Sequence, residues 1–330
     1  MTPGREKLSN YFKILEENQD AKYILCKHIP IIFNKGESTK KLWEKHDNNL
    51  KKIKLNDLLP KQSLLDLKIE LANRIFKKCC FCERRCQIDR TNKSGNCGVQ
   101  ESKISSEFLH LGEESVLVPS HTIFFSGCTF HCVFCQNWDI SQNNTGLYVD
   151  PSILSEIIVK RHAQGSKNVN WVGGDPTPNL PYILDTMKQL DVNIPQVWNS
   201  NMYCSLETMK LLDGIIDLYL TDFKYWDDNC AKRLSLVDSY LEVVKRNHLK
   251  AYQNGEVIVR HLVMPNHINC CSKSIMKWIS ENLPNAVVNI MAQYRPEYRA
   301  YEYKDILKKI YIEDVLDVKE YAEKLNIHQI

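Results

Sequence analysis

The feature that most constrains this chain is a regular alternation of short apolar runs with amphipathic segments, which begins near residue 121. The runs are rich in β-branched and aromatic residues, as β-strands are, and they occupy residues 121–127, 169–174, 195–201, 215–223, 256–265 and 287–294. Helix-like segments follow the runs at residues 151–165, 180–190, 205–214, 229–247 and 273–283. A repeated order of strand and then helix predicts a parallel sheet.

The length of the alternating region limits how far such a sheet can close. A complete eight-unit barrel uses about 250 residues, or about 31 for each strand–helix unit. Residues 122–299 therefore correspond to about six units. We predict an α/β fold built on a partial (β/α)6 barrel of the TIM type.

The rest of the chain differs in composition from the alternating region. We expect a helical N-terminal extension, a Cys-rich and turn-rich segment, the partial barrel and a C-terminal helical segment, at residues 1–78, 79–120, 121–300 and 301–330. Lysines crowd one stretch of the extension, and we interpret them as a solvated helical face, at Lys40, Lys41, Lys45, Lys51, Lys52 and Lys54.

Bulk composition excludes some classes of function. The net charge is +3, which produces no strong field for nucleic acid or for an acidic membrane surface. Residues 1–20 carry charges where a secretory peptide needs an apolar stretch, and no apolar run approaches the length of a membrane span. We therefore expect a cytoplasmic protein without a membrane partner. In a reducing compartment, cysteines serve metal binding or redox chemistry more often than disulfides.

Eight of the 13 cysteines fall between residues 79 and 135, in two groups. The second group is Cys128, Cys132 and Cys135, placed where the first predicted strand ends, which is the edge at which barrel enzymes hold their chemistry. Structural zinc uses four ligands, and a ferredoxin-type cluster uses four thiolates. Three thiolates on a [4Fe–4S] cluster would leave one iron open to a substrate or cofactor.

The stretch GCTFHCVFCQNW (127–138) resembles the signature of the radical S-adenosylmethionine (SAM) superfamily, and most of all the branch around pyruvate formate-lyase-activating enzyme. The resemblance implies a [4Fe–4S] cluster held by the three cysteines and a bound SAM. It implies that a one-electron reductant such as flavodoxin or ferredoxin reduces the cluster. SAM is then cleaved to methionine and a 5′-deoxyadenosyl radical, which abstracts hydrogen from a substrate. It also implies contacts to the cofactor from Phe134, near the adenine, and from Asn137.

Further marks of the resemblance lie at the ends of the later strands. The sequence GGDP, at Gly173, Gly174 and Asp175, is similar to the GGEP motif that contacts the SAM amino group, with aspartate in place of glutamate. The resemblance assigns the SAM carboxylate and ribose to four side chains, Asn199, Asn201, Asp222 and Lys224. Arg260, His261, Gln293 and Tyr294 are candidates for lining the site, and Tyr294 stands where the activase has a histidine.

The first cysteine group predicts a second metal site. Its thiols are Cys79, Cys82, Cys86 and Cys97, with Cys80 left out because it stands too close to Cys82 in the chain. Four thiolates in a loop-rich segment suit either tetrahedral zinc or an auxiliary iron–sulfur cluster. Nearby arginines would offset their charge, at Arg84, Arg85 and Arg90. The remaining cysteines read as small buried apolar residues, at Cys26, Cys204, Cys230, Cys270 and Cys271.

Three functions remain open from the sequence. The first is a radical SAM enzyme of activase type, which takes hydrogen from a protein or small-molecule substrate; where the partner is a glycyl radical enzyme, the hydrogen lies on a glycine. The second is radical modification of a peptide or an RNA. The third, of another class, is a non-catalytic binding module held together by metals. The substrate is not encoded in any motif that the sequence contains.

Overall fold

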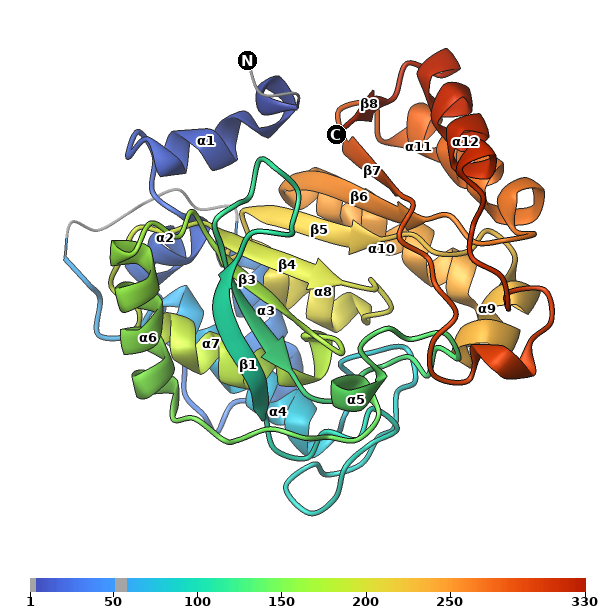
Figure 1. Ribbon diagram of the computed structural model, residues 1–330. Coiled ribbons are helices and arrows are strands. Elements are labelled where there is room, and N and C mark those ends of the chain that lie inside the picture. The colour runs from blue at the N-terminus through green and yellow to red at the C-terminus, as the bar shows by residue number, and fades with distance from the viewer. Residues whose placement is uncertain (1–3, 51–57) are drawn as a thin grey trace.

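One eight-stranded sheet forms the centre of the fold, and its strands lie side by side in chain order (Figure 1). The computed structural model describes residues 4–50 and 58–330. The strands are β1 (Ile104–His110), β2 (Ser120–Phe125), β3 (Val169–Gly173), β4 (Gln196–Ser200), β5 (Leu218–Asp222), β6 (Glu256–Leu262), β7 (Val287–Met291) and β8 (His328–Gln329). The strands β2 to β8 are parallel, and β1 pairs antiparallel with β2. The sheet stays open, since β1 and β8 are its two ends.

The six predicted strands are the parallel strands β2 to β7, so the prediction of a partial barrel of six units is confirmed. The edge strands β1 and β8 were not predicted. The sequence of β1, ISSEFLH, is mostly polar, because the strand pairs with β2 along one edge only and few of its side chains are buried. Strand β8 has two residues, too few for a periodic signal.

Most helices that connect the strands follow the predicted segments, but α5 (Trp138–Ser141) was not predicted. The others are α6 (Pro151–Ala163), α7 (Leu180–Gln189), α8 (Leu206–Leu212), α9 (Asp228–Ser235), α10 (Tyr240–Asn254), α11 (Lys273–Asn282) and α12 (Ile312–Lys324). The prediction of one helix over residues 229–247 is wrong, because this part of the chain forms α9 and α10 with a turn between them. Leu236 and Ser239 take left-handed φ values of 55° and 50° there, which no continuing α-helix allows.

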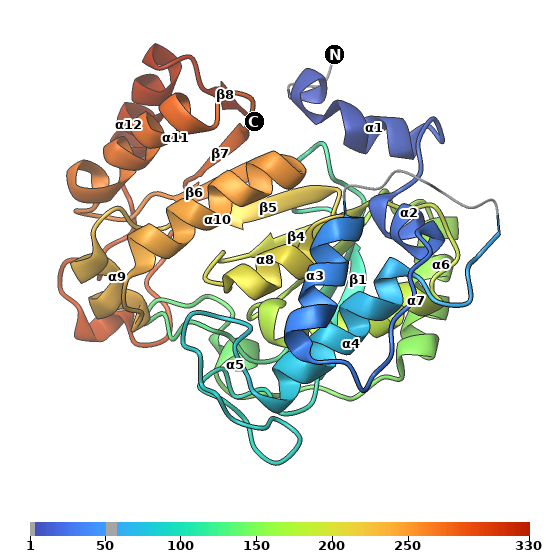
Figure 2. The ribbon, with the colours of Figure 1, turned by 180° about the vertical axis from the view of Figure 1, so that it is seen from behind.

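The N-terminal residues form η1 (Arg5–Leu8), α1 (Ser9–Leu15), α2 (Lys22–His28), α3 (Thr39–Asn49) and α4 (Leu64–Lys77). Helices α3 and α4 pack outside α7 and α8 (Figure 2). Lys68 of α4 is fully buried, and its Nζ donates to the backbone oxygens of Lys210, Leu211 and Asp213 at the end of α8. This cation satisfies carbonyls that a helix C-terminus leaves unpaired. The predicted lysine face is only partly described, since Lys51, Lys52 and Lys54 lie outside the described residues.

The β1–β2 connection closes the amino-terminal end of the sheet. Val116 and Leu117 of this loop pack with Leu8 and Tyr11 against apolar side chains of the central strands. Ile330, the last residue, packs against the same cluster. The interior of the half-barrel is therefore sealed at this end, and a ligand can enter only from the carboxyl ends of the strands.

The C-terminal residues, predicted as helical, contain η4 (Ala300–Glu302) and α12, and the chain then returns as β8 beside β7. Among the described helices, none is both long and apolar enough to cross a membrane.

Candidate functional site

The loop that carries the three cysteines begins where β2 ends. Gly127 takes a φ of +80°, and a Cβ at this position would lie 2.6 Å from the carbonyl oxygen of Cys97. The next residue donates its amide to that oxygen, with 3.2 Å between Cys128 N and Cys97 O. Only glycine permits this approach. This hydrogen bond joins the cysteine loop to the Cys-rich segment, although about 30 residues separate the two in the chain.

The three thiols face one cavity of about 450 Å³ at the carboxyl ends of the strands. Within the described part of the chain, the only cysteines that line it are Cys128, Cys132 and Cys135. Most of the predicted cofactor contacts line it too, namely Phe134, Asn137, Gly173, Gly174, Asn199, Asn201, Asp222, Lys224, Arg260 and Gln293. The structure therefore brings the strand-end motifs together around the thiols, as their positions in the sequence predict.

Hydrogen-bond donors surround the three sulfurs. The amide of Phe130 donates to Cys128 Sγ at 3.3 Å. Ser235 Oγ lies 2.9 Å from Cys132 Sγ, and Ser141 Oγ lies 3.3 Å from Cys135 Sγ. Hydrogen bonds to cluster sulfurs are one of the ways in which a protein sets the reduction potential of an iron–sulfur centre.

Burial makes two of these thiols poor anions on their own. Removal from water, followed by the neighbouring acidic groups, raises the pKa of Cys128 well above its ordinary value. Burial likewise raises the pKa of Cys132 to about 12, against the opposing effect of the Lys224 cation. A bound cation reverses this effect and deprotonates a coordinating thiol. Two buried thiols and the half-buried Cys135, with donors beside their sulfurs and room next to them, fit a [4Fe–4S] cluster held by these cysteines.

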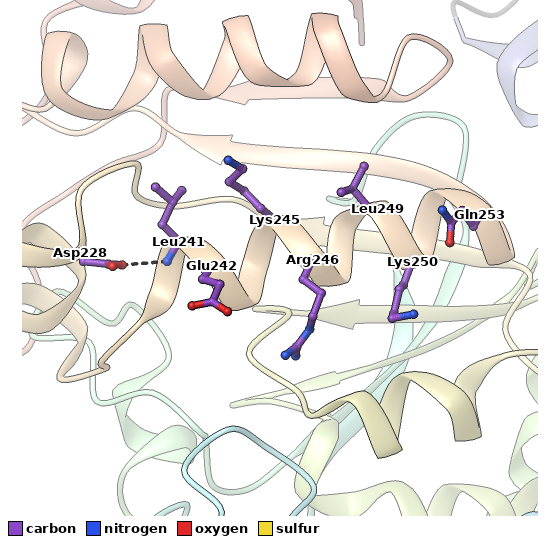
Figure 3. Close-up of a pocket in the computed structure, with 8 residues that line it drawn as sticks. All are labelled: Asp228, Leu241, Glu242, Lys245, Arg246, Leu249, Lys250 and Gln253. Carbon is purple, nitrogen blue, oxygen red and sulfur yellow. Dashed lines mark hydrogen bonds between the residues drawn. The ribbon is translucent and has the colours of Figure 1, made fainter.

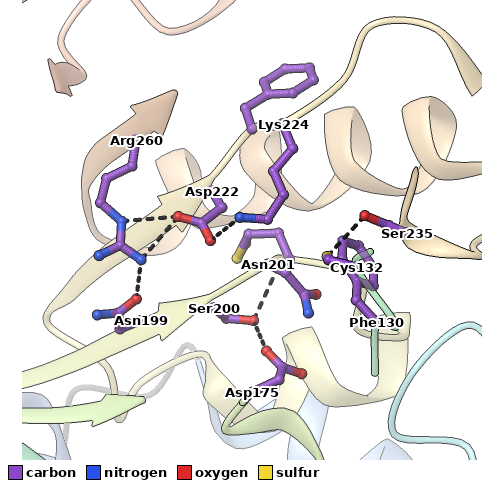
Figure 4. A network of polar contacts seen from close by, with 12 residues as sticks. Phe130, Cys132, Asp175, Asn199, Ser200, Asn201, Asp222, Lys224, Ser235 and Arg260 are labelled. Atoms are coloured by element: carbon purple, nitrogen blue, oxygen red, sulfur yellow. Dashed lines mark hydrogen bonds and ion pairs between the residues drawn. The ribbon is translucent and has the colours of Figure 1, made fainter. Parts of the chain in front are cut away.

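The floor of the cavity is a network of charged and polar side chains (Figure 4). Lys224 Nζ and Asp222 Oδ2 lie 2.7 Å apart, and Arg260 Nη2 lies 2.9 Å from Asp222 Oδ1. Burial alone would raise the pKa of Asp222, but the Arg260 and Lys224 cations outweigh it and hold that pKa at about 2. Asn199 accepts a hydrogen bond from Arg260, and its own amide nitrogen has no partner. The unpaired nitrogen is a donor available to a ligand oxygen.

Glu113, which the sequence did not single out, also lines the cavity. Its carboxylate lies 3.6 Å from Arg260 Nη1 and accepts from Asn170 Nδ2 at 3.1 Å. It comes from the β1–β2 loop, where burial raises its pKa. No signal in the sequence connects this loop to the site, because it reaches the cavity from the sealed end of the half-barrel.

Gly173 and Gly174 are required by contacts within the protein. A Cβ at Gly173 would collide with the backbone of Phe125, and one at Gly174 would collide with the carbonyl of Gly127. The two glycines thus let the ends of β2 and β3 approach closely. This constraint exists without any ligand.

Asp175 lies beneath the cavity, and it does not line the wall. It accepts hydrogen bonds from Ser200 Oγ at 2.8 Å and Thr129 Oγ1 at 3.1 Å. Thr129 in turn accepts from Asn201 Nδ2 at 2.9 Å. Burial raises the pKa of Asp175 to about 6. The structure therefore places this carboxyl among groups that position the cavity wall, while the cofactor contact that the resemblance implies for the GGDP stretch stays a prediction.

Two other predicted residues also lie outside the cavity wall. His261 is buried between the carbonyl oxygen of Phe223 and the hydroxyl of Ser272. Tyr294 donates its hydroxyl to the carbonyl of Ile306, and its ring lies 5.9 Å from that of Phe134. Both side chains are thus held by contacts within the protein, and a role for either toward the cofactor stays a prediction.

The first cysteine group forms a second cluster of thiols beside the loop. Burial raises the pKa of Cys79, Cys82 and Cys97, and each thiol interacts electrostatically with others of the group, including Cys86. The amides of residues Phe81, Arg84 and Val99, each two positions after its cysteine, lower these pKa values. Gly95 leaves room for a sulfur, because a Cβ there would lie 3.2 Å from Cys86 Sγ.

Of the three arginines near this group, one acts on its thiols. Arg90 is buried, lowers the pKa of Cys79 and Cys97, and donates to the carbonyl oxygens of Val99 and Pro178. Arg84 instead donates to Thr129 and Leu236 carbonyls, and Arg85 pairs with Glu83 and Glu207.

A wider surface hollow of about 650 Å³ lies along α10 (Figure 3). Two of its cations already have partners. Lys245 lies over the rings of Trp226 and Trp278, and Arg246 pairs with Glu83 at 3.0 Å. None of the residues that line it is a cysteine or a histidine. The chemistry of the molecule therefore lies at the strand ends and not in this larger hollow.

Residues 122–279 form a domain of the radical SAM superfamily, since the model of the family described as "Radical SAM superfamily" matches them. Members of this superfamily are enzymes that use a [4Fe–4S] cluster and SAM. A protein of Methanocaldococcus jannaschii described as "Uncharacterized protein MJ0674" is 51% identical over 340 residues, which cover 98% of this chain and 99% of that protein.

Similar solved structures include a domain of pyruvate-formate lyase-activating enzyme from Bacteroides vulgatus, with a TM-score of 0.40 and 14% identity over 50% of this chain and 98% of that one. Methylornithine synthase (PylB) has a TM-score of 0.44 and 15% identity over 97% of this chain and 84% of that one. SuiB of Streptococcus suis has a TM-score of 0.44 and 14% identity over 63% of this chain and 47% of that one.

The hydrogen bond from Ser235 to Cys132 generates a testable prediction. In Ser235→Ala the sulfur loses a donor, so we expect the cluster to become harder to reduce and its midpoint potential to shift to a more negative value. A redox titration followed by electron paramagnetic resonance measures this shift. Ser155→Ala, on α6, is the matched control and should leave the potential unchanged. An unchanged or more positive potential in Ser235→Ala would contradict the assigned role of this hydroxyl.

Proposed function

We propose that this protein is a radical SAM enzyme of activase type, which abstracts hydrogen from a glycine of a partner protein. One observation carries the chemical part of the proposal: three cysteines line the same cavity as the polar side chains from the ends of four other strands, and no fourth cysteine of the described residues lines it. The bound cluster and SAM would together supply the 5′-deoxyadenosyl radical.

The residues of this chain would have distinct tasks. Cys128, Cys132 and Cys135 would hold the cluster. The unpaired amide nitrogen of Asn199 would donate to a SAM oxygen, and Lys224 would attract the SAM carboxylate. Because Lys224 is already paired with Asp222, its charge is fixed in place before the cofactor binds.

The glycine substrate is supported by the motif in the cysteine loop, which is most similar to that of the activating enzymes. A flavodoxin or a ferredoxin would supply the electron. A cytoplasmic location stays a prediction.

We further propose that Cys79, Cys82, Cys86 and Cys97 hold an auxiliary iron–sulfur cluster in preference to zinc. Sulfurs on tetrahedral zinc lie about 3.8 Å apart, given Zn–S bonds of about 2.3 Å. Among the described residues, one group of potential metal ligands has all its ligand atoms within 4.8 Å of one another. That group does not include these four cysteines. A cluster of several irons accommodates sulfurs at wider spacing.

Cleavage of SAM is the direct test of the chemistry. After anaerobic reconstitution and reduction, the wild-type protein should convert SAM to 5′-deoxyadenosine, and Cys132→Ala should lose essentially all of this activity. Product is measured by liquid chromatography and mass spectrometry. Cys26→Ala removes a buried cysteine outside the site and should retain activity. Equal product from Cys132→Ala and the wild type would exclude the proposed function.

The substrate class is tested by isotope transfer. Protein extracted from cells grown on glycine deuterated at its α-carbon is offered to the reduced enzyme with unlabelled SAM. If the radical takes hydrogen from a glycine, deuterium should appear in 5′-deoxyadenosine. Extract labelled at the α-carbon of alanine is the control. Deuterium from the alanine label, or product without deuterium in both extracts, would contradict the glycine substrate while leaving SAM cleavage intact.

The auxiliary cluster is tested by metal analysis of reconstituted protein. Cys86→Ser should contain about four fewer irons per chain than the wild type. Cys80→Ser changes an adjacent thiol that we exclude from the ligand set, so its iron content should equal that of the wild type. Loss of zinc in place of iron from Cys86→Ser would show that the group holds zinc.

A further inference from the structure

Four potential ligands for a metal lie together away from the radical site. They are Cys230, His267, Cys270 and Cys271, and one ligand atom from each lies within 4.8 Å of the others. From the sequence alone, these three cysteines read as small buried apolar residues. Cys230 lies on α9, Cys270 and Cys271 lie on the π-helical turn η3 (Ile268–Ser272), which follows β6, and His267 directly precedes that turn. Such π-helical turns are frequent at functional sites.

The distances match those of a tetrahedral metal site. Cys270 Sγ and Cys271 Sγ are 3.8 Å apart. His267 Nδ1 lies 3.5 Å from Cys230 Sγ and 3.4 Å from Cys270 Sγ. Around Zn²⁺, bonds of about 2.3 Å to sulfur and about 2.0–2.1 Å to nitrogen produce edges of about 3.8 Å between sulfurs and about 3.6 Å between sulfur and nitrogen.

The surroundings of the histidine also suit a ligand. His267 Nε2 lies 3.3 Å from Asp305 Oδ2, so this nitrogen carries the proton and Nδ1 presents its lone pair to the sulfurs. A carboxylate that accepts from the outer nitrogen is the usual support of a metal-bound histidine. Asp305 itself is held by Arg233 through two contacts.

Polar and charged groups surround the sulfurs. The backbone amides of Trp226 and Asp227 lie within hydrogen-bond reach of the Cys271 thiol. Arg233 interacts electrostatically with Cys230, and its cation would offset part of the negative charge of three thiolates. Cys270 is exposed, which leaves an entry path for an ion.

We propose that Cys230, His267, Cys270 and Cys271 form a Cys3His site for Zn²⁺. Binding forms three Zn–S bonds and one Zn–N bond, and the three thiol protons are released to solvent without any change in oxidation state. Four protein ligands leave no open position, so the role of the metal is structural.

The site would support the radical centre through α9. The last turn of α9 accepts hydrogen bonds from the cysteine loop, with 3.1 Å from His131 N to Ser235 O and 2.9 Å from Val133 N to Leu234 O. Ser235 also contacts the sulfur of Cys132. A metal on Cys230 would tie this helix to the turn after β6, and hence to the opposite side of the half-barrel.

Metal content of the purified protein tests the proposal. The wild type should contain about one zinc per chain more than either Cys270→Ser or His267→Ala. Cys270→Ser changes an exposed thiol by one atom and is the variant with the least effect on folding. Cys80→Ser is the control and should keep its zinc, as should Cys86→Ser, whose expected loss is iron. Unchanged zinc in Cys270→Ser and His267→Ala, or loss of iron in its place, would overturn the zinc site.

Spectroscopy of the wild-type protein gives a second readout that does not depend on a variant. With Co²⁺ in place of zinc, a site with three thiolates should show the d–d bands of tetrahedral cobalt and a sulfur-to-metal charge-transfer band, both absent from Cys270→Ser. Octahedral cobalt spectra would overturn the proposal. So would a mass two units lower that marks a disulfide between Cys270 and Cys271.

Discussion

Three thiols that face one cavity, which no fourth cysteine of the described residues lines, form the constraint on which the rest of this structure depends. Burial opposes the thiolate form of Cys128 and Cys132, so that the arrangement suits a cation and would be an unfavourable place for free anions. Around them the protein supplies donors to the sulfurs and a polar floor. The paired charges of Asp222, Lys224 and Arg260 are set before any ligand arrives, which is the property expected of a preorganised site.

The cysteine loop is held from several directions by backbone contacts. Cys128 is fastened to the carbonyl of Cys97, and the amide of Asp175 donates to the carbonyl of Gly127. From the other side, α9 accepts from His131 and Val133. The proposed auxiliary cluster and the proposed zinc site both lie in segments that make these contacts. The auxiliary cluster and the zinc ion would thus both stabilise the position of the cysteine loop, which would hold the radical SAM cluster.

Much of the site was predictable because the ends of parallel strands meet at one edge of a sheet. Asn199 and Asn201 lie at the end of β4 and Lys224 follows β5, and the strand order brings them to one cavity. Asp175 stands in a similar place in the sequence but points beneath the wall, a difference of side-chain direction that no motif contains. Glu113 enters from a loop at the opposite end of the sheet. The cluster of Cys230 with His267 depends on how α9 packs against η3, and 36 residues separate these two in the chain.

By itself, the sequence determined the alternation of strands and helices, six of the seven parallel strands and the presence of three cysteines without a fourth nearby. These are properties of local order, since periodicity, turn residues and ligand spacing are all expressed within a few consecutive positions. Only the tertiary structure decided which side chains face the cavity, which carboxylate supports the wall and which distant thiols meet. Such choices follow from packing between elements far apart in the chain, where a rotation of one side chain or a bend between two helices decides what is in contact.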